Sequence, residues 1–363
     1  MKYNFFKSLI LSLLMLNLAS CKKYEAEELN LIGQNEPYIL NYGNFPPPDI
    51  HEDNLLTKEG VKLGKMLFYE KLLSRDNSIS CGSCHKQENA FSDINRFSVG
   101  VDGLIGGRQA MSVVNMAWNS NEYFWDGRAT LLRHQSLMPI EDALEMDETL
   151  TNVINKLINS SLYPQQFERA FGSKEITEER ISLAMEQFMN SIFSNKSKFD
   201  AYLSGNAVLS EEEERGRFLY FTEFNPSFPE ASGADCQHCH GGANFENDRY
   251  MNNGLDTDAE MTDSGREAVT GNPADRGKFK VTTLRNIELT PPYMHDGRFN
   301  TLEEVIDHYD RVKLSATLDG SFQQQLPSNG LNLSSDDKAA LVAFLKTLTD
   351  YELISNPEYA DPF

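Results

Sequence analysis

The sequence is poor in basic residues, in strand patterns and in long apolar runs. Lys and Arg together number 33 against 54 Asp and Glu, so the formal net charge is −21. A chain this acidic repels a phosphate backbone, which argues against nucleic acid as a partner. A protein partner would need a neutral or basic face, or would dock at a locally non-acidic patch. Beyond the first twenty residues, no apolar segment is long enough to cross a bilayer.

The N-terminus carries the exception, an apolar run between Leu9 and Leu16. This run is too short for a membrane-spanning helix, so residues 1–20 are predicted to be a signal peptide. Residues 18–21, Leu-Ala-Ser-Cys, resemble a bacterial lipobox, and cleavage before Cys21 would let several acyl chains anchor the protein. The alternative is a plain secretory signal with Cys21 as an incidental thiol. Both alternatives predict export, and the lipobox further predicts a periplasmic protein of the cell envelope whose only membrane contact is its lipid anchor.

Cysteine is also scarce, and its placement is informative. The chain has five cysteines, and the four beyond Cys21 fall into two Cys-x-x-Cys-His pentapeptides. This spacing is the attachment signature of c-type haem, in which two thiols bond the haem vinyl groups and the histidine binds the iron. The alternative is a disulfide or a zinc clip, which would need a long-range pairing of the two motifs. The sequence therefore predicts two covalently bound haems, held by Cys81, Cys84 and His85 and by Cys236, Cys239 and His240.

Helical patterns dominate the rest of the chain. Residues 21–50 are expected to form a tether, because they are acidic at first and end in three prolines, which favour extended chain. Thr57 is an expected helix N-cap, and Ser210 begins a capping box. Apolar residues recur at helical spacing over residues 55–73, 142–203, 302–308 and 336–348.

These patterns predict a mainly α fold of two cytochrome c-like haem domains packed against each other. The expected N-terminal haem domain covers residues 51–205, and the expected C-terminal haem domain covers residues 206–350. Each would have a helix, then its haem motif, then loops and further helices. The two halves therefore look like a distant duplication.

Four further segments stand out around the two motifs. They are Leu73-Ser74-Arg75-Asp76-Asn77-Ser78-Ile79-Ser80-Cys81, Phe124-Trp125-Asp126-Gly127-Arg128-Ala129, Thr283-Leu284-Arg285-Asn286 and Thr290-Pro291-Pro292-Tyr293-Met294-His295-Asp296-Gly297. Together these segments resemble the bacterial dihaem cytochrome c peroxidases and the MauG-type dihaem enzymes, and the resemblance runs from about Leu55 to about Leu348. In that family the N-terminal haem is the peroxide site and the C-terminal haem transfers electrons.

The resemblance implies three catalytic residues. Glu145 would move a proton between the peroxide oxygens, and Gln135 would orient peroxide or water. Trp125 would lie between the haems and relay charge. The alternative is that Gln135 and Glu145 are ordinary polar residues, and that Trp125 is a core aromatic, as we expect for Trp118.

Two departures from the family concern the iron ligands. Many family peroxidases have a histidine in the loop after the first motif, which closes the peroxide site until the other haem is reduced. Val101 takes that position here, which predicts an open site. At the C-terminal haem, peroxidases of the family usually supply a methionine as the distal ligand, whereas MauG-type enzymes use a tyrosine. Tyr309 takes this position, with Met294 and His308 as rivals and simple packing of Tyr309 as the alternative.

The family also binds calcium between the haems. By resemblance, Thr290 and Pro292 would supply backbone carbonyls. Gln109 stands where the family has an asparagine, so the amide oxygen is retained on a longer side chain.

Three functions follow from these residues. The first is a hydrogen peroxide reductase that takes electrons from a small cytochrome c or copper protein. The second is a MauG-like oxidase that modifies an aromatic residue of a partner protein, which Val101 and Tyr309 favour. The third is a non-enzymatic dihaem electron carrier, against which Gln135 and Glu145 argue.

Overall fold

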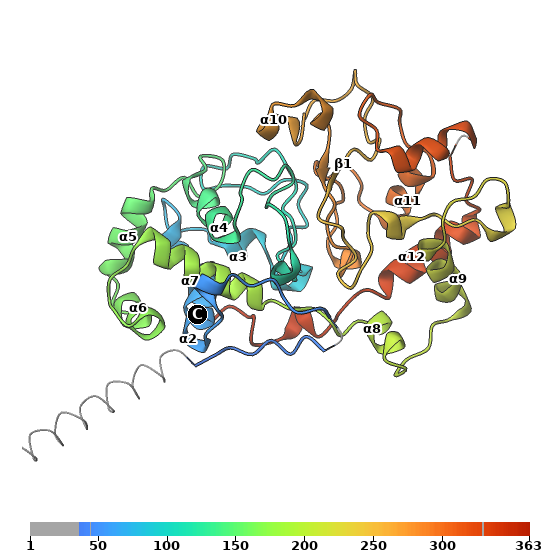
Figure 1. Ribbon diagram of the computed structural model, residues 1–363. Helices are drawn as coiled ribbons and strands as arrows, with labels where there is room; N and C mark the ends of the chain where they lie inside the picture. Colours follow the sequence, from blue (N-terminus) through green and yellow to red (C-terminus); the bar gives the residue numbers. More distant parts are fainter. Residues whose placement is uncertain (1–35, 44, 329) are drawn as a thin grey trace, which may run out of the picture.

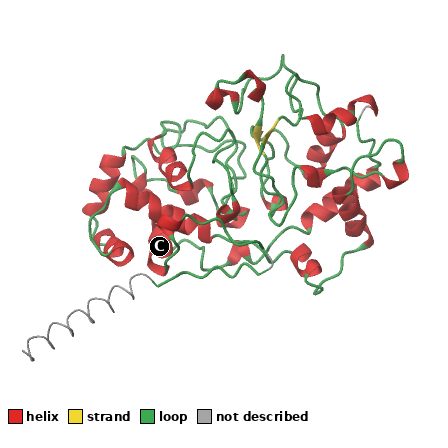
Figure 2. Cartoon of the chain, viewed as in Figure 1, coloured by secondary structure: helices red, strands yellow, loops and turns green. Residues whose placement is uncertain are grey.

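The computed structural model describes residues 36–43, 45–328 and 330–363 (Figure 1). The predicted signal peptide and Cys21 lie outside the described residues. Helices and loops make up almost all of the described chain, which confirms the predicted mainly α fold (Figure 2). The sheet is a single antiparallel pair of two-residue strands, β1 (Tyr250–Met251) and β2 (Phe279–Lys280). Among the described residues, no helix has the length and apolar character needed to cross a membrane.

The helices fall into two groups, one on each side of Figure 1. The N-terminal group contains α2 (Lys58–Tyr69), α3 (Cys81–Cys84), α4 (Leu132–Glu141), α5 (Leu150–Ile158), α6 (Tyr163–Phe171) and α7 (Glu178–Ser191). The C-terminal group contains α8 (Lys198–Leu203), α9 (Glu211–Phe221), α10 (Glu267–Thr270), α11 (Leu302–Asp310) and α12 (Ser335–Lys346). Three short 3-10 helices matter below: η3 (Gln87–Asn89), η6 (Cys236–His238) and η11 (Leu353–Ser355).

Two of these helices begin where the sequence predicts. The Thr57 hydroxyl accepts a hydrogen bond from the Gly60 amide at the start of α2. Ser210 and Glu213 form a reciprocal capping box at the start of α9, and each satisfies a backbone donor that the helix leaves free. Four consecutive glutamates in the first turn of α9 add a favourable interaction with the helix dipole.

A pair of crossed helices recurs in both halves. In the first half, Gly64 of α2 lies so close to α7 that an added Cβ would be 1.9 Å from the Ala184 carbonyl oxygen and 2.8 Å from Phe188 Cβ. In the second half, Gly216 of α9 lies equally close to the Ala340 carbonyl oxygen and Phe344 Cβ of α12. The same glycine, alanine and phenylalanine therefore make the same close contact twice, as expected for a duplicated module.

Each half has its own apolar core. The first core is built on α2 and α7 and includes Phe68, Phe91 and Phe188, and the second is built on α9 and α12 and includes Tyr220 and Phe344. Both cores flank the loops that run between the two groups of helices.

Both ends of the described chain join the first half. The described part of the expected tether does not hang free: the Trp118 indole donates to the Pro46 carbonyl (2.8 Å), and the Phe45 ring packs on Trp118 with centroids 5.3 Å apart. At the other end, Leu353 and Tyr359 are buried in the first core. The region that packs with the first haem motif is therefore larger than residues 51–205.

The close helix crossing predicts a steep cost for one added methyl group. We expect Gly64→Ala and Gly216→Ala each to lower the free energy of unfolding by about 1–3 kcal/mol, because the helices must separate to admit a Cβ. Chemical unfolding of the haem-loaded protein would measure the change. Gly320→Ala is the matched control, because a Cβ there meets no atom within 4 Å. Equal stability of all three variants would contradict the packing argument.

Candidate functional site

The two halves enclose one continuous cavity of about 730 Å³. Residues of both Cys-x-x-Cys-His motifs line it, and all four of these cysteines are free thiols. A cavity lined mainly by apolar groups, with a few convergent polar ones, is the usual form of a cofactor site. The structure therefore brings the two motifs, which are distant in sequence, to the same space.

The first motif occupies the single turn α3. Ser80 and Ser83 close its start, and the Ser80 amide donates to the Ser83 hydroxyl (2.9 Å). Gly82 is required here because a Cβ would be 2.4 Å from the Tyr69 ring. Burial raises the pKa of the Cys81 thiol to about 12, which keeps it protonated.

The ring of His85 is held by a backbone carbonyl. Its Nδ1 donates to the Phe91 carbonyl oxygen at 2.9 Å, which leaves Nε2 as the unprotonated nitrogen. A ring nitrogen that donates to a backbone carbonyl in this way is usual for a histidine whose other nitrogen binds a metal.

The second motif repeats this arrangement on η6. His240 Nδ1 donates to the Thr282 carbonyl oxygen at 3.0 Å, and the Tyr220 hydroxyl donates to the His240 carbonyl oxygen at 2.5 Å. Burial raises the pKa of the Cys236 thiol to about 12. In each motif, two thiols and a histidine nitrogen with a fixed tautomer face the cavity, so the residues present fit a covalently bound haem.

Gln135 and Glu145 line the cavity together with residues of the first motif. Gln135 lies on α4, and Glu145 lies in the turn after it. Burial, reinforced by the nearby Asp142 carboxylate and opposed by Arg128, raises the pKa of Glu145 above its ordinary value. The Glu145 charge in turn contributes to the raised pKa of Cys81, so the two groups lie within electrostatic reach.

The loop after the first motif packs directly on Glu145. The Val101 amide donates to the Glu145 carbonyl oxygen (2.9 Å), and a Cβ on Gly100 would be 2.6 Å from the same oxygen. Arg75 forms ion pairs with Asp102 in this loop and with Asp147 after Glu145. The Val101 position is therefore tied by its backbone to the segment that presents Glu145.

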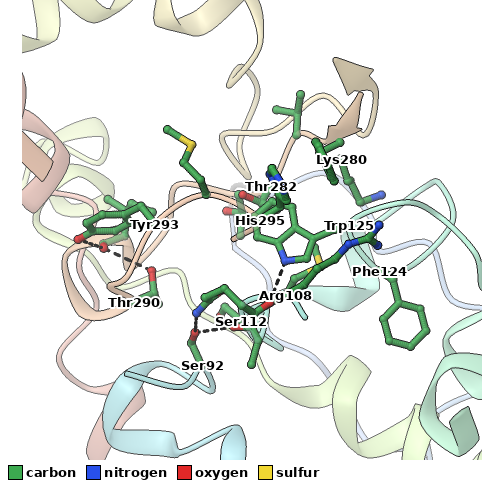
Figure 3. Close-up of a pocket in the computed structure, with 18 of the residues that line it drawn as sticks. Ser92, Arg108, Ser112, Phe124, Trp125, Lys280, Thr282, Thr290, Tyr293 and His295 are labelled. Atoms are coloured by element: carbon green, nitrogen blue, oxygen red, sulfur yellow. Dashed lines mark hydrogen bonds between the residues drawn. The ribbon is translucent and has the colours of Figure 1, made fainter. Parts of the chain in front are cut away.

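Trp125 lies where the two halves meet. Its indole nitrogen donates to the Gln109 carbonyl oxygen at 2.8 Å, and its own carbonyl accepts from the Lys280 amide at 2.8 Å. Figure 3 shows the indole beside His295, with the Phe124 ring turned away from it. Trp118 is not among the cavity residues and stacks on Phe193 with centroids 4.5 Å apart. It is half-buried and lies outside both apolar cores, so it is a packing aromatic but not a core one.

Arg108 links the Trp125 segment to the C-terminal half. It pairs with Asp126 (2.6 Å), next to Trp125, and makes two hydrogen bonds to Asp263 (2.8 and 2.9 Å). Asp126 is buried, so this pairing satisfies a carboxylate that would otherwise be costly to bury.

Tyr309 and Met294 both line the cavity, and Asn253 lies between them. The Asn253 side-chain amide donates to the Tyr309 hydroxyl (3.2 Å) and lies 3.5 Å from the Met294 sulfur. His308 is not among the cavity residues, and its Nε2 donates to the Asn253 carbonyl oxygen (3.1 Å). Of the three candidate ligands for the second iron, two therefore face the cavity.

Gln109, Thr290 and Pro292 also line the cavity. The Gln109 side-chain amide donates to the Ser92 hydroxyl (2.9 Å) and to the Asp93 carbonyl (3.3 Å). The side-chain carbonyl oxygen of Gln109 accepts no hydrogen bond from the described residues, whereas its backbone carbonyl accepts from the Trp125 indole.

Three further residues of the site belong to no sequence motif that would predict their role: Arg108, Tyr220 and Asn253. Arg108 acts through Asp263, which is 155 residues away, so no local pattern could reveal the pair. Tyr220 had one available signal, because it stands four residues after Gly216 just as Phe68 stands four residues after Gly64.

Comparisons with known proteins agree on one family. Residues 58–208 match the family model of the di-haem cytochrome c peroxidases. The cytochrome c551 peroxidase of Nitrosomonas europaea is 36% identical over 292 residues, which are 80% of this chain and 79% of the relative. The methylamine utilization protein MauG of Methylophilus methylotrophus is 32% identical, over 81% of this chain and 84% of that protein.

A solved structure extends the likeness to the fold. A MauG-like protein associated with microbial copper homeostasis superposes with a TM-score of 0.80 at 34% identity, over 90% of this chain and 99% of the other. Membership of this family implies two haems per chain. The chain belongs to the family of dihaem cytochrome c peroxidases and MauG proteins.

Proposed function

We propose that the protein is a dihaem peroxidase that reduces hydrogen peroxide with electrons from a small redox protein. Cys81, Cys84 and His85 would hold the peroxide-reducing haem, and Cys236, Cys239 and His240 the electron-transferring haem. The observation that carries the proposal is the shared cavity, which both motifs line together with Gln135, Glu145 and Trp125. The same observation argues against a simple electron carrier, which has no use for an acid–base group at one motif.

The two haems implied by the family determine which steps are left to the side chains of the protein. When bound, the first haem would supply the iron at which the peroxide oxygen–oxygen bond breaks, and the second would hold an oxidising equivalent. Two electrons and two protons convert hydrogen peroxide to two waters. The electrons come from the donor protein, and the protein must supply and direct the protons.

Glu145 is the proposed proton carrier. Its carboxylate would take the proton from one peroxide oxygen and return it to the other, which leaves as water. Its raised pKa suits both halves of this task, because a group with a pKa nearer to neutral accepts and releases a proton more readily. Gln135, on the preceding helix, would orient the peroxide.

Val101 supports a site that needs no opening. A valine has no atom that can bind iron, and the loop from 86 to 107 contains no histidine. The backbone bond of Val101 to the Glu145 carbonyl would keep the loop beside the site. Peroxide would then reach the first haem without prior reduction of the second.

Trp125 and Tyr309 are the proposed redox-tuning residues. Trp125 bridges the two halves through the Gln109 carbonyl and the Lys280 amide, so its indole would relay charge between the haems. Tyr309 would bind the second iron, and the hydrogen bond from Asn253 would orient its oxygen. A phenolate ligand stabilises ferric and higher iron states.

The position of Tyr309 favours a second candidate function, a MauG-like oxidase that modifies an aromatic side chain of a partner protein. This activity needs an oxidised state that lasts until the partner docks, and a tyrosine ligand would provide it. The 34% identity to a MauG-like protein over 90% of the chain supports the same alternative.

Calcium is a further proposed ligand, held by the Gln109 side chain and the carbonyls of Thr290 and Pro292. The Gln109 amide group is held by Ser92 and Asp93, so its carbonyl oxygen is left to bind an ion. Hard oxygen donors of this kind suit calcium.

We also propose that residues 1–20 are a lipoprotein signal peptide, and that Cys21 carries the lipid anchor. The mature protein would then work in the periplasm, where c-type haem is attached. Residues 51–205 would form the peroxidatic haem domain and residues 206–350 the electron-transfer haem domain, with residues 351–363 packed on the first of them.

Replacing Glu145 tests the proton carrier. We expect Glu145→Gln to lower peroxide turnover by roughly 10²–10⁴-fold with both haems retained, because the amide keeps the shape but cannot carry the proton. Steady-state assays with a reduced donor would measure this. Glu141→Gln is the matched control, because Glu141 is an exposed residue at the end of α4. Unchanged turnover in Glu145→Gln would remove Glu145 from the mechanism.

The charges around Glu145 predict how activity depends on pH. Glu145 must be ionised to accept a proton, so turnover should fall as the pH drops through its raised pKa. Asp142→Asn removes a negative charge and should move this acid limb to lower pH. Arg128→Gln removes a positive charge and should move it to higher pH. Acid limbs that coincide in both variants would show that another group controls the profile.

One experiment separates the two candidate functions. The ferric protein is mixed with peroxide, with and without reduced cytochrome c. Rapid oxidation of the cytochrome is expected for the peroxidase. A long-lived oxidised protein that leaves the cytochrome reduced would instead support the MauG-like function.

A further inference from the structure

The chain does not end with the C-terminal haem domain. After α12 it crosses to the N-terminal half, and Figure 1 shows the C-terminus beside α2. We call residues 351–363 the strap. Leu353 and Tyr359 of the strap are 2% and 6% exposed, and both belong to the core built on α2 and α7. The strap is therefore part of the domain that carries the first haem motif.

Asp350 fixes the start of the strap where the two halves join. It is 2% exposed, and its amide donates to the Asn286 side chain at 2.8 Å. Its carboxylate accepts hydrogen bonds from the Lys196 amide (3.1 Å) and the Ser194 hydroxyl (3.2 Å) in the segment that links the halves. The strap thus leaves the C-terminal half at a defined point.

The strap holds the turn that follows the first haem motif. The Gln87 side-chain amide donates to the Leu353 and Asn356 carbonyls, both at 2.8 Å. Gln87 stands two residues after His85. The same two carbonyls also accept backbone hydrogen bonds within the strap, that of Leu353 from the Asn356 amide (3.4 Å) and that of Asn356 from the Tyr359 amide (3.1 Å), so Gln87 binds carbonyls that the strap itself holds in place.

A second contact reaches the partner of the His85 ring. Tyr359 packs edge-on against Phe91, with ring centroids 6.3 Å apart. The Phe91 carbonyl accepts the hydrogen bond from His85 Nδ1. The Tyr69 hydroxyl, in turn, donates to the Tyr359 carbonyl (2.8 Å). The strap therefore contacts both ends of the turn from residue 85 to residue 91.

In the second module, a hydrogen bond from the module's own first helix holds the haem motif. There, the Tyr220 hydroxyl of α9 donates directly to the His240 carbonyl (2.5 Å). The equivalent position of α2, four residues after the matching glycine, is Phe68, which has no hydroxyl. The first module thus lacks the internal hydrogen bond of the second, and contacts from the other end of the chain take its place.

We propose that the strap is a positioning element for the first haem, and that Gln87 and Tyr359 hold the His85 turn in place of the hydrogen bond that Tyr220 makes in the second module. This rests on the proposed roles of His85 and His240 as iron ligands. The strap ties the axial ligand of the peroxide-reducing haem to the docking of the C-terminal half.

The test measures the reduction potentials of both haems in the haem-loaded protein by spectroelectrochemical titration. Gln87→Leu removes both donors to the strap, and it should raise one potential, because a loosened histidine donates less charge to ferric iron. Tyr220→Phe removes the corresponding hydrogen bond in the second module and should move the other potential. Glu88→Gln, at the exposed neighbouring position of η3, should move neither.

Deletion of residues 353–363 should shift the same potential as Gln87→Leu. Should the deleted protein fail to fold, Tyr359→Ala and Gln87→Leu keep the test decisive. The wild-type protein must first be shown to bind two haems. The proposed role of the strap is then contradicted if Gln87→Leu and Tyr359→Ala leave both potentials unchanged, or if they shift the potential that Tyr220→Phe shifts. Fewer than two haems per wild-type chain, measured as pyridine haemochrome, would instead overturn the proposed function and the strap role with it.

Discussion

Two hydrogen bonds from histidine rings to backbone carbonyls are the constraint on which the site depends. His85 donates to the Phe91 carbonyl and His240 to the Thr282 carbonyl. Each bond decides which ring nitrogen is left unprotonated and which way it points. The carbonyls belong to loops, so the packing that fixes those loops also fixes the two histidine rings that we propose as iron ligands.

A repeated pair of crossed helices provides the support. Gly64 and Gly216 let two helices in each half approach to backbone contact, which leaves little freedom for the motif that follows. Helices and loops of both halves line the cavity, and Arg108 joins the halves there by pairing with an acidic residue from each. Each half therefore has an equivalent pair of closely packed helices that supports its haem motif. The differences between them, such as Phe68 against Tyr220, give the two haem positions different surroundings.

The parts of this site that can be predicted from the sequence are those whose interacting residues lie close together in the chain. The haem motifs and the Thr57 cap involve neighbours in sequence, so spacing alone reveals them. Glu145 is far from the first motif and was found only through resemblance to a family, and its role stays a proposal. The pairing of Arg108 with a residue 155 positions away has no periodic signal at all. Three prolines agree with the lack of helix and strand in residues 45–50, but they cannot tell that Phe45 packs on the domain instead of trailing from it.

The burial of Leu353 and Tyr359 in the N-terminal core sets an order of assembly. A chain emerges from the ribosome N-terminus first, yet the core around the first haem motif cannot be completed until Leu353 and Tyr359 have been made. The first pair of thiols therefore remains in an unfinished core until the second half of the chain has been synthesised.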